Sequence, residues 1–107
     1  MNIMKMMKQA SDMQHRIETM QAELAGKEIE FTSGGGKVSV TARGDLSISK
    51  IRLDPQVVDP GDVELLEDLV LSAVDGALKA ARELSAREME KITAGLPLPP
   101  GMKLPFG

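Results

Sequence analysis

Apolar residues recur every three or four positions along the stretch 59–92, which is the spacing of an amphipathic helix. Asp59 and Pro60 are typical of a helix start, and Gly95 and Pro97 are typical of a helix end. The pattern therefore predicts one long helix over residues 59–92. Its apolar positions are Leu66, Val70, Ala73, Ala77, Ala80 and Leu84.

The same spacing runs through residues 1–25 and predicts a first amphipathic helix with a coiled-coil-like seam. Gly26 follows it as a stop signal. Methionine is frequent along the seam and makes the apolar face adaptable. Such a face needs a helical partner. The seam residues are Ile3, Met6, Ala10, Met13, Ile17, Met20 and Leu24.

Between the two helices the apolar residues alternate with polar ones, which is the period of a half-buried strand. Residues 28–32 and 38–43 are predicted strands, joined by a hairpin loop at the glycines 34–36. A third strand is predicted over residues 46–53. Its alternation changes parity near residues 49 and 50, which predicts a β-bulge there. The expected fold is α+β, in the order helix, three-stranded antiparallel sheet, long helix.

Small residues gather in the middle of the long helix around Gly76, where glycine costs about 1 kcal/mol relative to alanine. With the neighbouring alanines it predicts a smooth face that another helix approaches closely. Residues 95–107 contain four prolines. We therefore expect one domain over residues 1–94, followed by an extended proline-rich tail over residues 95–107.

The composition limits the class of protein. A chain of 107 residues with two Phe and no Trp or Tyr builds a modest core, which favours dimerisation. Cysteine is absent, and the chain shows neither a signal peptide nor an apolar run of transmembrane length. These features predict a soluble protein of the cytoplasm. The net charge of −3 argues against a protein coated in positive charge.

Charge is segregated along the chain. Residues 59–76 carry six acids and no base, whereas residues 77–94 carry four bases and three acids. Residues 1–16 carry three bases and one acid. If the first helix lies antiparallel to the long one, its basic start meets the basic end of the other. The candidate phosphate-binding residues are Lys5, Lys8, Arg16, Arg82, Arg87 and Lys91.

A plainer interpretation is that several of these cations only form ion pairs across helical turns. Their acidic neighbours in the long helix are Glu83, Glu88 and Glu90.

The chain offers little for catalysis. Its one histidine, His15, is predicted on the polar side of the first helix without metal-binding partners. Glu67 and Asp68 are adjacent, but consecutive helical residues point in different directions. The sequence therefore predicts neither an enzyme nor a protein with a metal or cofactor.

Blocks of residues along nearly the whole chain resemble the YbaB/EbfC family of bacterial nucleoid-associated proteins. Their order and spacing together make the resemblance specific. The matching residues are Met4, Lys8, Gln9, Ala10, Met13, Gln14, Glu23, Leu24, Val38, Val40, Thr41, Ile51, Asp54, Pro55, Leu66, Glu67, Asp68, Leu69, Val70, Ala73, Ala77, Leu98, Pro99, Pro100, Gly101 and Met102.

The resemblance implies a tweezer-like homodimer of the nucleoid that binds DNA, alters its conformation and affects gene expression. There are two departures. Asp75 and Gly76 stand where members often carry an asparagine followed by an aspartate, and the start of the chain is shorter than in some members.

Two functions fit these patterns. The first is a dimeric architectural protein that binds double-stranded DNA, because the chain lacks aromatic platforms for stacking unpaired bases. The second is a protein-protein interaction module without direct DNA binding, which uses the methionine-rich and alanine-rich helical faces. Only the first predicts binding to duplex DNA that weakens as salt rises.

Overall fold

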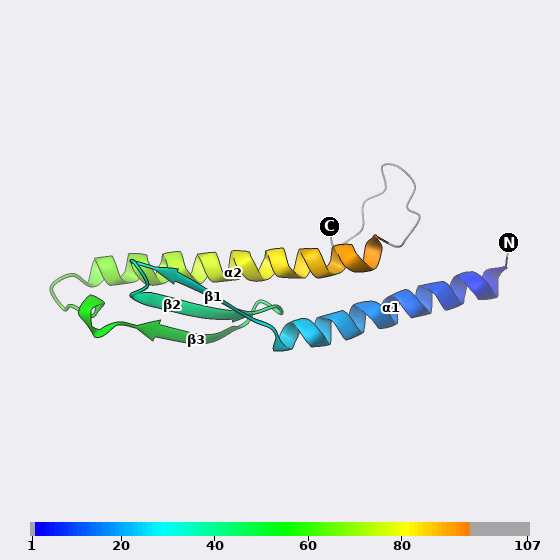
Figure 1. Cartoon of the computed structure of the whole chain (residues 1–107), viewed down its shortest axis with the longest axis horizontal. Helices are drawn as coiled ribbons and strands as arrows, with labels where there is room; N and C mark the ends of the chain where they lie inside the picture. Colours follow the sequence, from blue (N-terminus) through cyan, green and yellow to red (C-terminus); the bar gives the residue numbers. More distant parts are fainter. Residues whose placement is uncertain (1, 95–107) are drawn as a thin grey trace.

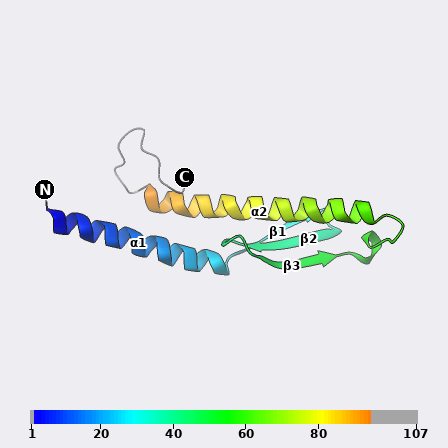
Figure 2. The same ribbon diagram turned by 180° about the vertical axis from the view of Figure 1, so that it is seen from behind.

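The computed structural model describes residues 2–94, which form an elongated molecule with extents of 70 × 27 × 16 Å. Helix α2 covers one face of the sheet, and the C-terminal half of α1 lies beside the last part of α2, while its N-terminal half extends beyond α2 (Figures 1 and 2). The predicted α+β order is confirmed. The elements are α1 (Ile3–Gly26), β1 (Glu28–Ser33), β2 (Val38–Arg43), β3 (Ile48–Leu53), a 3-10 turn (Pro55–Val57) and α2 (Val63–Thr93). The predicted tail, residues 95–107, lies outside the described residues.

The sheet is antiparallel, with β2 between β1 and β3. The predicted bulge is present: Thr41 pairs with Lys50 but Ala42 pairs with Ile48, so Ser49 has no partner in the ladder. The extra residue restores the parity of β3. As a result, all the apolar side chains of β3 lie on the face that carries the buried residues of β2. They are Ile48, Ile51 and Leu53.

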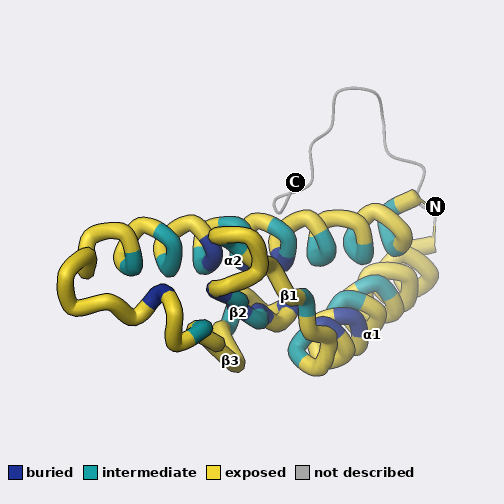
Figure 3. Tube along the Cα trace, turned by 60° about the vertical axis from the view of Figure 1, so that its left-hand side comes forward, coloured by how far each residue is buried: buried dark blue, intermediate teal, exposed yellow. Residues whose placement is uncertain are grey.

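The core is a contact between small side chains of α2 and the central strand β2 (Figure 3). Because alanine adds only a methyl group, the helix approaches the sheet closely. The smooth face of the long helix was expected to receive another helix, and this part of the prediction is wrong: it packs on the sheet. The fully buried residues at this contact are Val38, Val40, Ala42, Ala73, Ala77 and Ala81.

Gly76 serves the same contact. A Cβ atom built there would lie 2.2 Å from Cε1 of Phe31, well inside van der Waals contact. The glycine therefore makes room for the Phe31 ring of β1, which remains 40% exposed.

The start of α2 differs from the prediction. The helix begins at Val63, and its N-cap is Asp62, whose carboxylate accepts a hydrogen bond from the Leu65 N–H at 3.2 Å. The predicted cap, Asp59, is wrong because its carboxylate accepts from the Gly61 N–H at 2.9 Å and closes a turn before the helix. Both aspartates satisfy free backbone donors, but only the second does so within the helix.

Among the described residues, 2–94, helix α1 packs on the rest of the molecule through its last turns. Met20 and Leu24 are buried, and a Cβ atom at Gly44 would lie 2.6 Å from the Leu24 carbonyl oxygen. Every residue from Ile3 to Ser11 is exposed. The predicted seam of α1 is therefore covered only towards its C-terminal end. Neither described helix is long and apolar enough to cross a membrane.

Candidate nucleic-acid interface

The two helices run antiparallel, but the N-terminal turns of α1 extend beyond the end of α2 (Figure 1). The predicted meeting of their basic stretches is therefore seen at Arg16 and Lys91, and not at Lys5 and Lys8. A cleft of about 520 Å³ lies between the helices and is lined by Arg16 of α1 and Lys91 of α2. We call residues 3–16 of α1 and 82–94 of α2 the helical end. It carries six bases and four acids.

Along α2, the opposite part of the molecule is acidic, whereas residues 82–94 carry three bases and three acids. We call the three strands and residues 63–81 of α2 the sheet end. The stretch 59–76, which leads into and forms the first half of α2, carries six acids and no base. A polyanion therefore meets less repulsion from α2 at the helical end.

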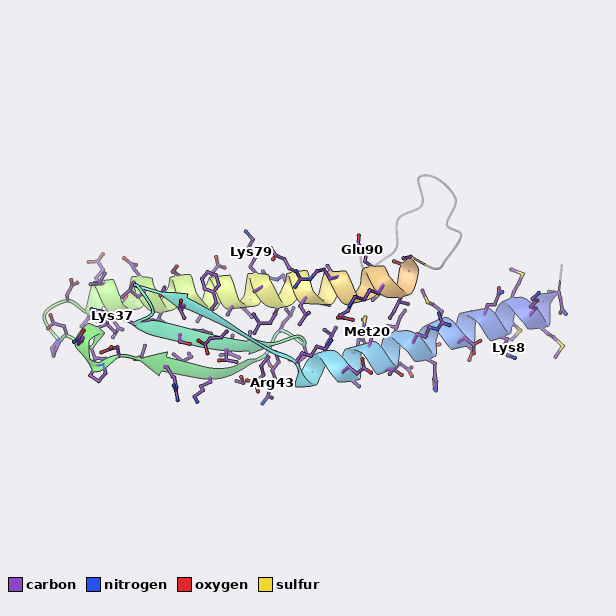
Figure 4. The ribbon with its side chains drawn as sticks, in the orientation of Figure 1. Lys8, Met20, Lys37, Arg43, Lys79 and Glu90 are labelled. Carbon is purple, nitrogen blue, oxygen red and sulfur yellow. The ribbon has the colours of Figure 1, made fainter. Side chains whose placement is uncertain are left out.

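Four of the six candidate cations lie on or beside α1. Lys5 and Lys8 are exposed on the outer turns of α1, and Figure 4 shows Lys8 far from the sheet. Arg16 and Lys91 line the cleft together. The cleft is not uniformly basic, because its lining also includes acids. They are Asp12, Glu23 and Glu88.

The other two candidates do not join them in one patch. Both are exposed, and Arg82 lines a second hollow with Met20, Leu46 and Met89. A separation of five residues turns a helix by about 140°, so Arg82 and Arg87 lie on different sides of α2. The six cations are thus spread around the helical end.

An ion-pair network joins the two helices near the base of the cleft. The Lys27 Nζ lies 3.2 Å from Glu88 Oε1, and the Lys91 Nζ lies 3.3 Å from the same oxygen. The hydrogen bond from Lys27 has the largest effect on the Glu88 carboxyl, followed by the hydrogen bond from Lys91. Together they hold its pKa below the ordinary value. The plainer interpretation of helical-turn pairing is confirmed for Lys91 and Glu88, since they lie three residues apart.

Lys27 was not among the predicted residues. It lies 61 positions from Glu88 in the sequence, so no local spacing indicates the pair. Within residues 2–94, Glu83 and Glu90 form no ion pair.

His15 lies on the same cleft with its side chain 87% exposed. Its Nδ1 atom is 3.8 Å from Glu18 Oε2, one turn away. Among the residues that the structure describes, no three His, Asp or Glu side chains converge as metal ligands would.

Comparison with known proteins decides the family. The model of the YbaB/EbfC DNA-binding family matches residues 1–96. This chain belongs to that family. A nucleoid-associated protein of Granulibacter bethesdensis is 45% identical over 105 residues, which cover 98% of each chain. A nucleoid-associated protein of Thermoanaerobacter pseudethanolicus is 52% identical over 98 residues, which cover 92% of this chain and 88% of that one.

The fold has a counterpart among solved structures. The crystal structure of an uncharacterized protein from Helicobacter pylori matches with a TM-score of 0.77 at 20% identity, over 86% of this chain and 97% of that one. At this identity the likeness supports the fold. In this YbaB/EbfC chain, Asp75 and Gly76 are the two residues of α2 that differ from the pattern expected for the family. Asp75 is exposed, and Gly76 leaves room for the Phe31 ring.

Proposed function

We propose that this protein is a homodimer that binds double-stranded DNA through its helical ends and alters the conformation of the DNA. It would act in the cytoplasm, on the nucleoid, in nucleoid organisation and gene regulation. One observation carries the proposal: the antiparallel helices place Arg16 and Lys91 on one cleft, and the exposed Lys5 and Lys8 continue along α1 beyond the end of α2. The family and the nucleoid-associated relatives support it.

The proposed dimer explains an apolar surface that a single chain leaves open. Helix α2 packs on β1 and β2, and β3 lies at the edge of the sheet with every residue exposed. Its core-facing side chains are exposed by 38–49%, although they continue the buried face of β2. We call them the β3 strip. An open apolar edge strand is a natural site for a second copy. The β3 strip consists of Ile48, Ile51 and Leu53.

The dimer is tested by two neighbouring substitutions on β3. Ile51→Glu places a charge in the β3 strip, whereas Arg52→Glu changes the opposite face of the same strand. Light scattering after size-exclusion chromatography should give a dimer for the native chain and for Arg52→Glu, and a monomer for Ile51→Glu. Equal masses for the two variants would exclude the β3 strip as the interface.

Contact with duplex DNA is inferred from the cations of the helical end and from its lack of Phe, Trp and Tyr. Lysine and arginine side chains at the helical end are suited to bind phosphates, and their exposure leaves them accessible. Residues 3–16 and 82–94 contain no Phe, Trp or Tyr on which unpaired bases would stack. Two helical ends in a dimer give the duplex two points of attachment, and this geometry lets binding change the path of the DNA.

DNA binding is tested by removing equal charge from the two ends. One variant carries Lys5→Gln, Lys8→Gln and Arg87→Gln at the helical end. The matched control carries Lys37→Gln in the turn between β1 and β2, with Lys50→Gln and Arg52→Gln on β3, and makes the same change in net charge. Fluorescence anisotropy with a short duplex should show a large loss of affinity for the first variant only, and a salt slope shallower by about 0.9 per lost phosphate contact.

The outcomes separate the two functions considered. Affinity that does not change with salt, or an absence of binding by the native chain, would favour the protein-protein interaction module. Equal losses in both variants would mean that net charge alone governs binding. Energy transfer between dyes at the two ends of the duplex then measures the change in DNA conformation, and an unchanged end-to-end distance would contradict that part of the proposal.

A further inference from the structure

The Glu88 carboxylate pairs with two lysines, one of which lies far away in the sequence. It accepts from Lys27, which follows the end of α1, and from Lys91, one turn further along α2. Its side chain is 18% exposed, whereas those of Lys27 and Lys91 are 48% and 73% exposed. The acid is therefore held between the helices, while both lysines remain accessible to a ligand.

A carboxylate and a phosphate compete for the same ammonium groups. Both are anionic oxygen acceptors, and each forms charge-assisted hydrogen bonds with lysine. Two lysines beside one carboxylate present a combined charge of +1, where the lysines alone would present +2. Glu88 thus weakens the attraction that this part of the helical end exerts on a phosphate.

We propose that Glu88 is an internal competitor for DNA phosphate: by pairing with Lys27 and Lys91, it limits the affinity of the helical end for duplex DNA. This inference rests on the proposed function. It also adds Lys27 to the cations available to DNA. Loss of the Glu88 charge frees both lysines, so the protein binds more tightly and its affinity depends more strongly on salt.

Glu90 provides a matched control. It lies two residues from Glu88 on the same helix, and its side chain points away from α1 (Figure 4). Within residues 2–94 it forms no ion pair with a lysine. Glu88→Gln and Glu90→Gln therefore remove the same charge from nearly the same place, but only the first releases Lys27 and Lys91.

The experiment measures the affinity of the full chain for a short DNA duplex by anisotropy over a series of salt concentrations. Glu88→Gln should bind about two- to fivefold more tightly than Glu90→Gln, the factor expected for one or two exposed charge pairs. Its salt slope should be steeper by about 0.9 for each lysine that gains a phosphate contact. In a background of Lys27→Gln and Lys91→Gln, the two glutamate variants should have equal affinities.

Three results would overturn the inference. The first is equal affinity and slope for Glu88→Gln and Glu90→Gln. The second is weaker binding by Glu88→Gln, which would make Glu88 a residue that positions the helices for DNA. The third is a difference that persists without the two lysines. If Glu88→Gln is less stable, a constant fraction of the protein is inactive and every apparent affinity falls by the same factor. The slope of affinity against salt is then unchanged by the inactive fraction, so it still distinguishes Glu88→Gln from Glu90→Gln.

The result also separates this inference from the proposed function. A native chain that binds no duplex DNA would overturn both. A native chain that binds in a salt-dependent manner, with Glu88→Gln indistinguishable from Glu90→Gln, would overturn only the role of Glu88.

Discussion

The sheet end and the helical end of this molecule are built on the same long helix but differ in packing and charge. At the sheet end, α2 presents small residues that are fully buried against β2. At the helical end, α2 and α1 enclose an open cleft and α1 leaves nine successive residues exposed, from Ile3 to Ser11. Close packing should make the sheet end intolerant of added volume, whereas the helical end should tolerate changes in shape and respond to changes in charge.

The largest expected effect is from added volume at the centre of the sheet end. Ala77→Leu forces three additional carbon atoms into a fully buried contact and should lower the free energy of unfolding by about 3 kcal/mol. The same change at the exposed Ala86 of the helical end should stay within about 0.5 kcal/mol. Urea denaturation followed by circular dichroism measures both. Equal losses would contradict the difference in packing.

A smaller effect is expected from Gly76→Ala. The substitution improves helix propensity, but its Cβ atom displaces the Phe31 ring, so we expect a net loss of about 1 kcal/mol. Gly26→Ala is the control, because a Cβ atom there meets no atom within 4 Å. In a Phe31→Ala background, Gly76→Ala should become stabilising. Denaturation midpoints test this reversal, and a loss that persists without Phe31 would contradict the explanation.

Loss of one hydrogen bond at the sheet end should have an effect of similar or smaller size. The Ser33 hydroxyl donates to the Leu69 carbonyl oxygen at 2.6 Å and joins β1 to α2. Ser33→Ala should lower the free energy of unfolding by about 1 kcal/mol. The matched change at the helical end is Ser11→Ala, where the residue is exposed. Thermal unfolding of both variants should show a lower midpoint only for Ser33→Ala.

The smallest effect concerns the dependence of stability on pH at the helical end. Lys27 and Lys91 lower the pKa of Glu88 in the folded protein, so ionised Glu88 contributes stability above its unfolded pKa, near 4.5. This contribution is lost as pH falls through the lowered folded pKa. The difference in unfolding free energy between the native chain and Glu88→Gln should therefore shrink as pH falls. Denaturation at several pH values measures it, and a constant difference would contradict the ion-pair assignment.

The two ends also differ in how far the sequence predicts them. Local periodicity is enough for the helices, the strands and the bulge at Ser49, because each depends on neighbouring side chains. The role of Gly76 and the pair of Lys27 with Glu88 depend on partners far away in the sequence, and no spacing indicates them. The prediction of Asp59 as the N-cap was wrong for a different reason. Asp59 and Asp62 are equally suited to cap a helix, and the turn between them determines that the helix begins after Asp62.

The candidate site was predictable as a charge distribution. The acidic first half and the more basic second half of α2 are visible in the sequence. The antiparallel arrangement brings the latter beside Arg16, whereas Lys5 and Lys8 lie beyond the end of α2. The separation of Arg82 from Arg87 around the helix follows from helical geometry. The partial neutralisation of Lys91 depends on Lys27 and Glu88 and requires the structure.

The central claim, that DNA is bound at the helical end, is tested most directly by site-specific photo-crosslinking. The chain has no cysteine, so Gln9→Cys on α1 and Gln56→Cys beside the sheet end each provide one attachment point for a photoreactive label. Both positions are exposed. We predict that duplex DNA crosslinks to the label at residue 9 and much less to the label at residue 56, and that added salt removes the product. Equal or stronger crosslinking at residue 56 would contradict the account.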